Sequence, residues 1–281
     1  MSWTGIVAAL DSGDSFRSRV SVYLHPLAGW PMVRHVVRAL SEVSPQPDSV
    51  RVLHGFKAPP LALPEEENGI PVRLEEVSGD GDSVLRALRA AVTPHGEKVL
   101  IEGTAVLVTA ATIARLLRAG EDGIATLVDP RMENVSLAVC GEGPALASAE
   151  DPRHPEGSFR VAATSADELV RIVDRHTMAE AAMAIRDRLV RAHEARGVSF
   201  VLPSSTWIDA DVRIGPDTVI YPGAVIEGRS EIGSECVIGP YCRIVEATIG
   251  RGVELKGWNY VTRTMIRNHA VIEPYVRRGF D

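Results

Sequence analysis

The chain has 281 residues, of which 45% are hydrophobic, 24% charged and 5% aromatic, proportions that exclude a disordered, collagenous or low-complexity protein. Its formal charge of −7 argues against a general nucleic-acid binder or a basic membrane-surface protein. The three cysteines lack metal-ligand spacing, and neither a leader segment nor a long apolar run is evident, so we expect a cytoplasmic protein without a membrane span.

The first 164 residues alternate short apolar strands with helices. We expect strands at 6–9, 50–53, 99–101, 124–128 and 135–139, and helices at 31–40, 83–92 and 110–117. This alternation is typical of a parallel sheet with helices on both faces, which predicts a Rossmann-like α/β domain over 1–164. In such folds the ligand crevice lies beyond the carboxyl ends of the strands, so we look for chemistry in the loops there.

A linker helix is predicted over 165–197. Ser165 and Glu168 have the spacing of a capping box, in which each side chain bonds the backbone of the other residue. Apolar residues follow at roughly helical spacing, and Gly197 supplies a stop. We interpret this segment as a connecting helix.

From residue 208 on, an aliphatic residue recurs at every sixth position. The series is Ile208, Ile214, Ile220, Ile226, Ile232, Ile238 and Ile244, and four residues after each stands a small or medium side chain: Val212, Thr218, Ala224, Ser230, Cys236, Cys242 and Thr248. A period of six is typical of a parallel β-helix with six residues on each face of a triangular coil. We expect both series to point inward. The corners would use the open backbone angles of Gly215, Gly223, Gly228, Gly233 and Gly239.

The repeat becomes less regular toward the end of the chain. After Ile244 the aliphatic series shifts by one residue to Ile249, and it shifts again at Ile266. Residues 198–281 are therefore predicted to form a short solenoid of three to four coils.

Two stretches resemble one known family, the bifunctional N-acetylglucosamine-1-phosphate uridylyltransferase/glucosamine-1-phosphate acetyltransferases. LHPLAGWPM at 24–32 is similar to the segment after the family's nucleotide loop, and residues 207–223 are similar to its entry into the β-helix. The resemblance is strong over 189–256, moderate over 1–130 and poor over 131–165. It implies a nucleotidyltransferase-like domain, a linker helix and a left-handed hexapeptide β-helix that assembles into a trimer.

The resemblance places the nucleotide loop at residues 10–15, where several expected groups are replaced. Gly13 matches, but Asp11 stands for a glycine, Asp14 for a threonine and Ser15 for the arginine, and the family's lysine falls on Val22. A carboxylate beside a phosphate is unfavourable by roughly one to a few kcal/mol. The same three polar residues could instead form a solvated turn. Two interpretations of the loop therefore stay open, a ligand pocket and a solvated turn.

The uracil-side segment and the metal position differ as well. Gly79 matches, whereas Asp80 and Asp82 replace a threonine and a histidine. The family's metal-binding aspartate falls on Thr104, with Glu102 two residues before it as a conceivable substitute. No complete metal-ligand set results, and Mg²⁺ is the one cofactor that the pattern leaves open.

The acetyl-transfer site of the family lies on later coils, between subunits. This sequence ends where those coils would begin, and Arg277 and Arg278 lie near the first expected arginine without the lysine or histidine that should follow. His269 fits a corner residue of the coil rather than a general base.

These differences lead to competing hypotheses, neither with an identified catalytic residue. In the first, the protein is a pseudoenzyme that has lost both transfer reactions and serves as a ligand-binding or assembly module. It would assemble through the β-helix, either as a homotrimer or with a related enzyme. A pure scaffold is the variant of this hypothesis in which no ligand binds. The alternative is a diverged transferase for an amine-containing or metal-chelated small substrate. Clustered acids (Asp11, Asp14, Asp80, Asp82 and Glu102) would suit such a substrate, or they could form a solvated rim.

Overall fold

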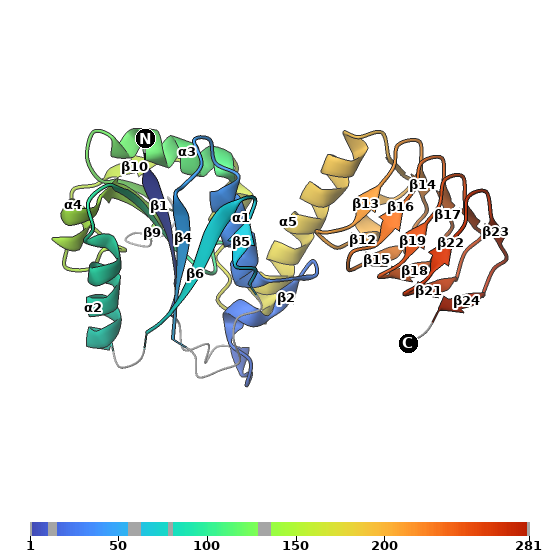
Figure 1. Ribbon diagram of the computed structural model, residues 1–281, viewed down its shortest axis with the longest axis horizontal. Helices are drawn as coiled ribbons and strands as arrows, with labels where there is room; N and C mark the ends of the chain where they lie inside the picture. Colours follow the sequence, from blue (N-terminus) through green and yellow to red (C-terminus); the bar gives the residue numbers. More distant parts are fainter. Residues whose placement is uncertain (1, 11–15, 56–62, 78–80, 129–135, 280–281) are drawn as a thin grey trace. The chain divides into compact units, whose positions relative to one another are not determined.

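The computed structural model describes residues 2–10, 16–55, 63–77, 81–128 and 136–279. The chain divides into two compact units (Figure 1), one comprising Met1–Pro26 and Pro31–Ala181 and the other Leu27–Trp30 and Ala182–Asp281. The division falls inside a long helix rather than at its ends. No helix among the described ranges combines the length and the apolar character that a membrane crossing needs.

The N-terminal unit is built on an eight-stranded sheet of order β10-β8-β9-β7-β1-β4-β6-β5. The strands are β1 (Trp3–Ala9), β4 (Ser49–His54), β5 (Glu66–Glu67), β6 (Ile70–Glu76), β7 (Glu97–Glu102), β8 (Ala125–Val128), β9 (Ser136–Glu142) and β10 (Phe159–Val161). The central run β7-β1-β4-β6 is parallel, as predicted. In contrast, β9 runs antiparallel to both β7 and β8, so the sheet is mixed.

Helices cover both faces of this sheet. Figure 1 shows α1 (Met32–Ser41) and α3 (Ala110–Gly120) on one face and α2 (Gly81–Val92) and α4 (Gly143–Ala147) on the other. Strand alternation sends Ile6 and Leu100 toward Leu88 of α2 and Leu146 of α4, where they form one buried cluster. The expected Rossmann-like fold is thus confirmed, whereas β6, β10 and α4 were not predicted.

The predicted linker helix is shorter than expected and starts differently. A 3₁₀ turn covers Ala166–Leu169, residues 170–174 are not helical, and α5 spans Arg175–Glu194. The side chain of Asp174 accepts a hydrogen bond from the Thr177 amide at 2.8 Å, so Asp174 acts as the N-cap. Glu168 instead points into the unit, where it accepts hydrogen bonds from the Thr109 amide at 2.9 Å and from the Thr164 hydroxyl.

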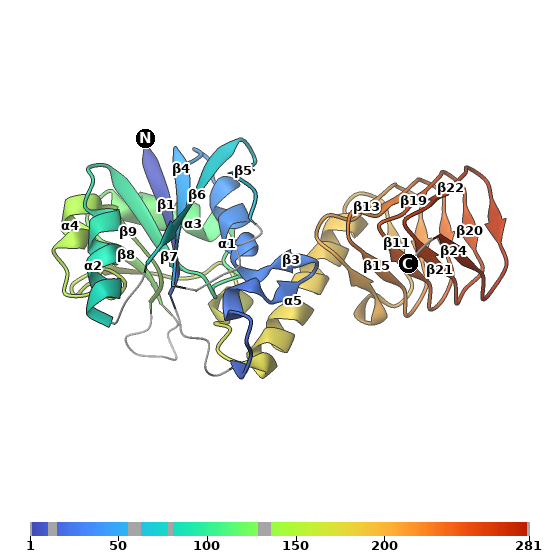
Figure 2. The same cartoon turned by 60° about the horizontal axis from the view of Figure 1, so that its bottom comes forward.

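The C-terminal unit is the predicted parallel β-helix, whose coils Figures 1 and 2 show stacked on one another. Its three sheets have the orders β11-β14-β17-β20-β23, β12-β15-β18-β21-β24 and β13-β16-β19-β22. The strands are Ser199–Phe200, Trp207–Ile208, Arg213–Ile214, Val219–Ile220, Val225–Glu227, Glu231–Ile232, Val237–Ile238, Arg243–Val245, Thr248–Ile249, Glu254–Leu255, Tyr260–Thr262, Met265–Ile266, Val271–Ile272 and Arg277–Gly279, numbered β11 to β24. With four or five strands in each sheet, the solenoid is somewhat longer than the three to four coils expected.

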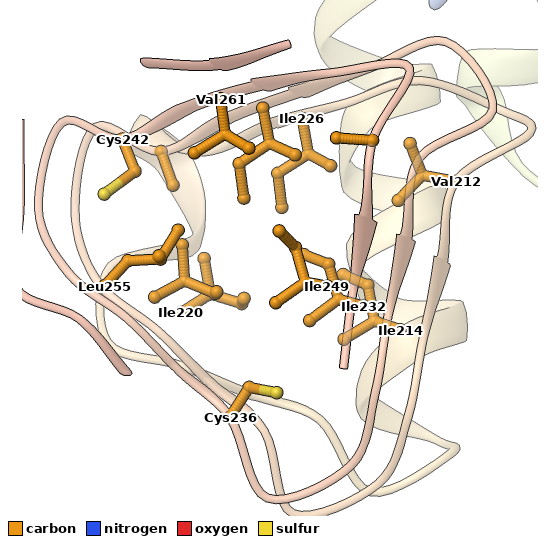
Figure 3. Close-up of a cluster of buried hydrophobic side chains, with 14 of the residues drawn as sticks. Val212, Ile214, Ile220, Ile226, Ile232, Cys236, Cys242, Ile249, Leu255 and Val261 are labelled. Carbon is orange, nitrogen blue, oxygen red and sulfur yellow. The ribbon is translucent and has the colours of Figure 1, made fainter. Parts of the chain in front are cut away.

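The aliphatic residues of the repeat fill the interior of the coils (Figure 3). Ile214 lies beside Ile232, and Ile232 beside Ile249, so one coil has eighteen residues and the next seventeen. The lost residue turns Thr248 outward, and Ala247 takes the inward position expected for it.

The corner glycines serve two different purposes. Gly223 and Gly228 have positive φ angles of +75° and +67°, as the repeat predicted. Gly215 and Gly233 do not; they are needed because successive coils touch there, and a Cβ on Gly233 would lie 2.7 Å from the backbone nitrogen of Arg251.

A hairpin of β2 (Pro26–Leu27) and β3 (Trp30–Pro31) carries the LHPLAGWPM segment. Its tip, Leu27–Trp30, belongs to the β-helix unit. There the Ala28 carbonyl accepts a hydrogen bond from the Ala210 amide at 2.9 Å, and the Trp30 indole donates one to Asp211 at 2.8 Å. These residues of the family-like segment therefore make structural contacts.

Candidate functional site

The predicted crevice lies at the carboxyl ends of β1, β4 and β7, which share one edge because these strands are parallel. Most of the predicted pocket residues follow β1 or β6 directly. Asp11, Gly13, Asp14 and Ser15 fall in 11–15, and Gly79 and Asp80 fall in 78–80, so all six lie outside the described residues. Their roles stay predictions.

The remaining three candidates are described. Asp82 is an exposed residue in the first turn of α2. Glu102 is the half-buried last residue of β7, and Thr104 is buried in the turn that follows. Of these three, the structure thus brings Glu102 and Thr104 to the end of the same strand.

The turn after β7 is tightly packed. The Gly103 amide donates to the Ala8 carbonyl at 2.9 Å, and the Ala105 amide closes the turn on the Glu102 carbonyl at 2.9 Å. The ring of Tyr23 covers Gly103, where a Cβ would lie 3.0 Å from two ring carbons. Within this turn the Thr104 side chain is 2% exposed, and its hydroxyl has no hydrogen-bond partner among the described residues.

The position aligned with the family's lysine is apolar in structure as well as in sequence. Val22 lies in a 3₁₀ turn, Val22–Leu24, and is 2% exposed. Its side chain is therefore part of the core and supplies no cation.

An arginine lies beside Glu102 instead. Glu102 and Arg153 line the same small hollow with Leu100 and Leu137. Arg153 forms a double contact with Asp151, at 2.8 Å from Nη2 to Oδ2 and 3.1 Å from Nε to Oδ1. The hydrogen bonds that Arg153 donates to Asp151 raise the pKa of Arg153, and the charge of Glu102 adds to this effect. The Glu102 carboxylate therefore lies beside the positively charged guanidinium group of Arg153.

A metal ion would need several such oxygens together. Within the part of the chain that the structure describes, no three His, Cys, Asp or Glu side chains are close enough to share one. The acidic crevice of the alternative hypothesis therefore depends on Asp11, Asp14 and Asp80 alone, since Asp82 is exposed on α2 and Glu102 lies beside a cation.

A histidine and a second arginine complete this region. The Ser136 amide lies 3.5 Å from His154 Nδ1. Burial lowers the pKa of His154; Asp151 opposes this effect, and the charges of Arg153 and Arg171 add to it. Arg171 lies in the non-helical stretch before α5, and its Nε is buried without a hydrogen-bond partner among the described residues.

Sequence reasoning missed Arg153, His154 and Arg171 for two reasons. The first two belong to 131–165, where the family resemblance is poor. Arg171 lies within the predicted linker helix, and a helical position gave no reason to expect it near the end of β7. A break in the apolar spacing of that helix after Val173 is the one signal that could have revealed it.

Comparisons with known proteins found the following similarities. Residues 211–245 match the family model described as "Bacterial transferase hexapeptide (six repeats)". The bifunctional protein GlmU of Shouchella clausii is 26% identical over 335 residues, covering 98% of this chain and 73% of the relative. GlmU of Thermoanaerobacter pseudethanolicus is also 26% identical, with 96% and 70% covered. A solved nucleotidyl transferase from Methanothermobacter thermautotroptrophicus has a TM-score of 0.48 at 21% identity and covers 68% of this chain and 98% of its own.

The matched length is itself informative. It spans 335 residues in the first of these relatives, whereas this chain has 281 in total. That relative therefore carries residues inside the matched region that this chain lacks. Because similarity extends over nearly the whole chain and includes the hexapeptide repeat, the resemblance is confirmed: the chain is similar to GlmU and combines a nucleotidyltransferase-like α/β unit with a hexapeptide-repeat β-helix.

Proposed function

We propose that this protein is a degenerate sugar-nucleotidyltransferase-like protein that has lost uridylyl transfer, and that its N-terminal unit binds a phosphorylated small molecule. The observation that carries the proposal is the end of β7. Thr104, a buried residue without charge, stands where the resemblance places a metal-binding carboxylate, and Glu102 beside it faces Arg153.

Nucleotidyl transfer needs this kind of charge compensation. Negative charge builds on the attacked phosphate in the transition state, and cations or a metal ion stabilise it there. The lysine position is the buried Val22, and the arginine position is Ser15. Binding a phosphate group requires fewer protein groups than transferring it, because binding does not need the groups that act only in the transition state.

Calorimetry and product release test this proposal together. The full chain is titrated with UTP, CTP and UDP-N-acetylglucosamine in the presence of Mg²⁺, and pyrophosphate release from each triphosphate is followed with a sugar phosphate present. We expect saturable binding of at least one of these compounds and no pyrophosphate above the protein-free control. Enzymatic pyrophosphate release from either triphosphate would refute the loss of transfer.

Assembly is the second part of the proposal. We expect a homotrimer formed through the β-helix, with association with a related enzyme as the alternative, and a location in the cytoplasm on the sequence grounds given above. Large apolar side chains on the outside of the coils support association, among them Met265 and Tyr275, which are 70% and 72% exposed. Sedimentation equilibrium tests it: a monomer at micromolar concentration would contradict a homo-oligomer.

A further inference from the structure

We propose that the outer edge of β10 is a docking site for an extended peptide segment of a partner protein, in which apolar and acidic residues alternate. The segment would join the sheet of the N-terminal unit as one more strand. This inference goes beyond the proposed ligand binding, because it concerns the edge of the sheet rather than the carboxyl ends of its central strands.

The first observation is the unpaired side of β10. This strand is the last of the eight-stranded sheet, and within the described ranges it pairs with β8 alone. The Phe159 amide donates to the Ile124 carbonyl at 2.7 Å. Because neighbouring peptide groups of a strand point to opposite sides, the N–H and C=O groups of Arg160 point away from β8. They form an open edge of the kind to which another strand can bind.

The second observation is a groove along this edge. Its volume is about 440 Å³, which is within the range of about 300–1,000 Å³ that ligand sites typically have. Val128, Val161 and Leu169 supply its apolar lining. Phe159 lies on the same face of β10 as Val161 and is 55% exposed. An added strand would therefore place its own apolar side chains against Phe159 and the groove.

The third observation is the charge at the same edge. Arg160 is exposed, lines the groove and has no ion-pair partner among the residues that the structure describes. Side chains alternate along a strand, so Arg160 lies on the opposite face from Phe159 and Val161. A strand with acidic residues on one face and apolar residues on the other would complement both faces.

The hydroxyl groups at the groove are already engaged. Those of Thr164 and Ser165 both donate to the Glu168 carboxylate. Backbone groups and Arg160 are therefore the principal donors that the groove offers to a ligand.

These features favour a peptide over two other occupants. A second copy of this chain that paired through β10 would bring its own Arg160, and like charges opposite each other on paired strands are destabilising. A small apolar molecule would leave the outward N–H and C=O groups of Arg160 unused. The backbone of an extended peptide pairs with these groups while its alternate side chains fill the groove.

Fluorescence anisotropy with the full chain and a labelled probe peptide tests the inference. The probe has seven residues, valine alternating with glutamate, so it matches the two faces of β10 in either chain direction. We expect saturable binding. Arg160→Glu should weaken it by about fivefold or more. The matched control is Arg86→Glu, the same charge change at an exposed site of α2, which should bind as the wild type does.

A second probe, with lysine in place of glutamate, provides the converse test. Its affinity should be higher for Arg160→Glu than for the wild type. Arg86→Glu has the same net charge as Arg160→Glu and should not show this gain. The two variants thus separate a contact at β10 from general attraction to a negatively charged protein.

Methylation of the probe backbone distinguishes strand addition from binding through side chains alone. Only alternate N–H groups of an added strand face β10. One version of the valine–glutamate probe is methylated on the valine nitrogens and another on the glutamate nitrogens. One of the two should lose binding, and the other should keep it.

Three results would overturn the inference: no saturable binding of the valine–glutamate probe, equal affinities for the wild type and Arg160→Glu, or equal affinities of the two methylated probes. None of them bears on the proposed function. The loss of transfer is decided by pyrophosphate release, and ligand binding by titration with the nucleotides.

Discussion

One corner of the β-helix carries a stack of three exposed aromatic side chains. The ring centroids of Tyr241 and Trp258 are 5.6 Å apart, and those of Trp258 and Tyr275 are 5.5 Å apart, with interplanar angles of 26° and 22°. All three residues have left-handed backbone angles, with φ of 55°, 51° and 63°. Such a conformation costs a residue other than glycine about 1–2 kcal/mol, whereas one aromatic pair contributes about 0.5–1.5 kcal/mol.

These opposing terms predict an unusual order of stability at position 258. Trp258→Ala loses both stacking contacts, about 1–3 kcal/mol in total, and keeps the backbone strain. Trp258→Gly loses the same contacts but relieves a strain of about 1–2 kcal/mol, at an entropic cost of about 0.5–1 kcal/mol. The glycine variant should therefore be the more stable of the two, by roughly 0.5–1 kcal/mol.

Urea denaturation followed by circular dichroism measures this difference. The control is the same pair of substitutions at Tyr260, which lies in β21 and has no positive φ. There the glycine variant should be the less stable one, by about 0.5–1 kcal/mol. If Trp258→Gly unfolds at a lower urea concentration than Trp258→Ala, the corner is not strained and the reasoning fails.

Three further predictions concern pH, coil contact and a buried carboxylate. Burial lowers the pKa of His193 and His154 below 6.5; the folded state therefore takes up protons less readily than the unfolded one, and stability should fall as pH drops below 6.5. Denaturation at pH 7.5, 6.5 and 5.5 measures this loss, and His193→Leu should reduce it. Gly233→Ala should destabilise by about 1–3 kcal/mol, because its Cβ would meet the backbone of the next coil, whereas Gly55→Ala, with its nearest atom at 3.6 Å, should change the urea midpoint little. Glu168→Gln should cost about 1.5–3 kcal/mol, because an amide cannot accept all the hydrogen bonds that the carboxylate accepts; an unchanged midpoint would contradict this.

The repeat of the β-helix could be predicted because it is local. The inward aliphatic residues recur every six positions, so the period is visible in the sequence itself. The sequence pattern does not contain the contacts between one coil and the next. The exceptions arise where coils interact. Thr248 faces outward because one coil is a residue shorter than the one before it, and Gly233 is required by the neighbouring coil rather than by its own φ angle.

The predicted capping box failed for a related reason. The spacing of Ser165 and Glu168 fits the motif, but the Ser165 hydroxyl donates to the Glu168 carboxylate at 3.4 Å and makes no capping bond to the backbone. The other donors to Glu168 are Thr109, nearly sixty residues earlier, and Thr164. Burial alone would raise the pKa of Glu168, yet the hydrogen bonds from these threonines outweigh burial and lower it. A four-residue pattern cannot show that a distant threonine supplies a stronger set of donors.

The family resemblance and the candidate site depend on different residues, and this separates fold from function. In the LHPLAGWPM segment, Gly29 is needed because a Cβ there would lie 2.8 Å from the Asp209 side chain, and Trp30 bonds Asp211. These contacts maintain the fold whatever reaction takes place. At the end of β7, by contrast, the position expected to hold a metal ligand is Thr104, and the nearby cations, Arg153 and Arg171, lie outside the ranges where the resemblance is strong or moderate. Identity of about 26% to GlmU therefore establishes the architecture, while the ligand chemistry has to be sought in Thr104, Arg153 and Arg171.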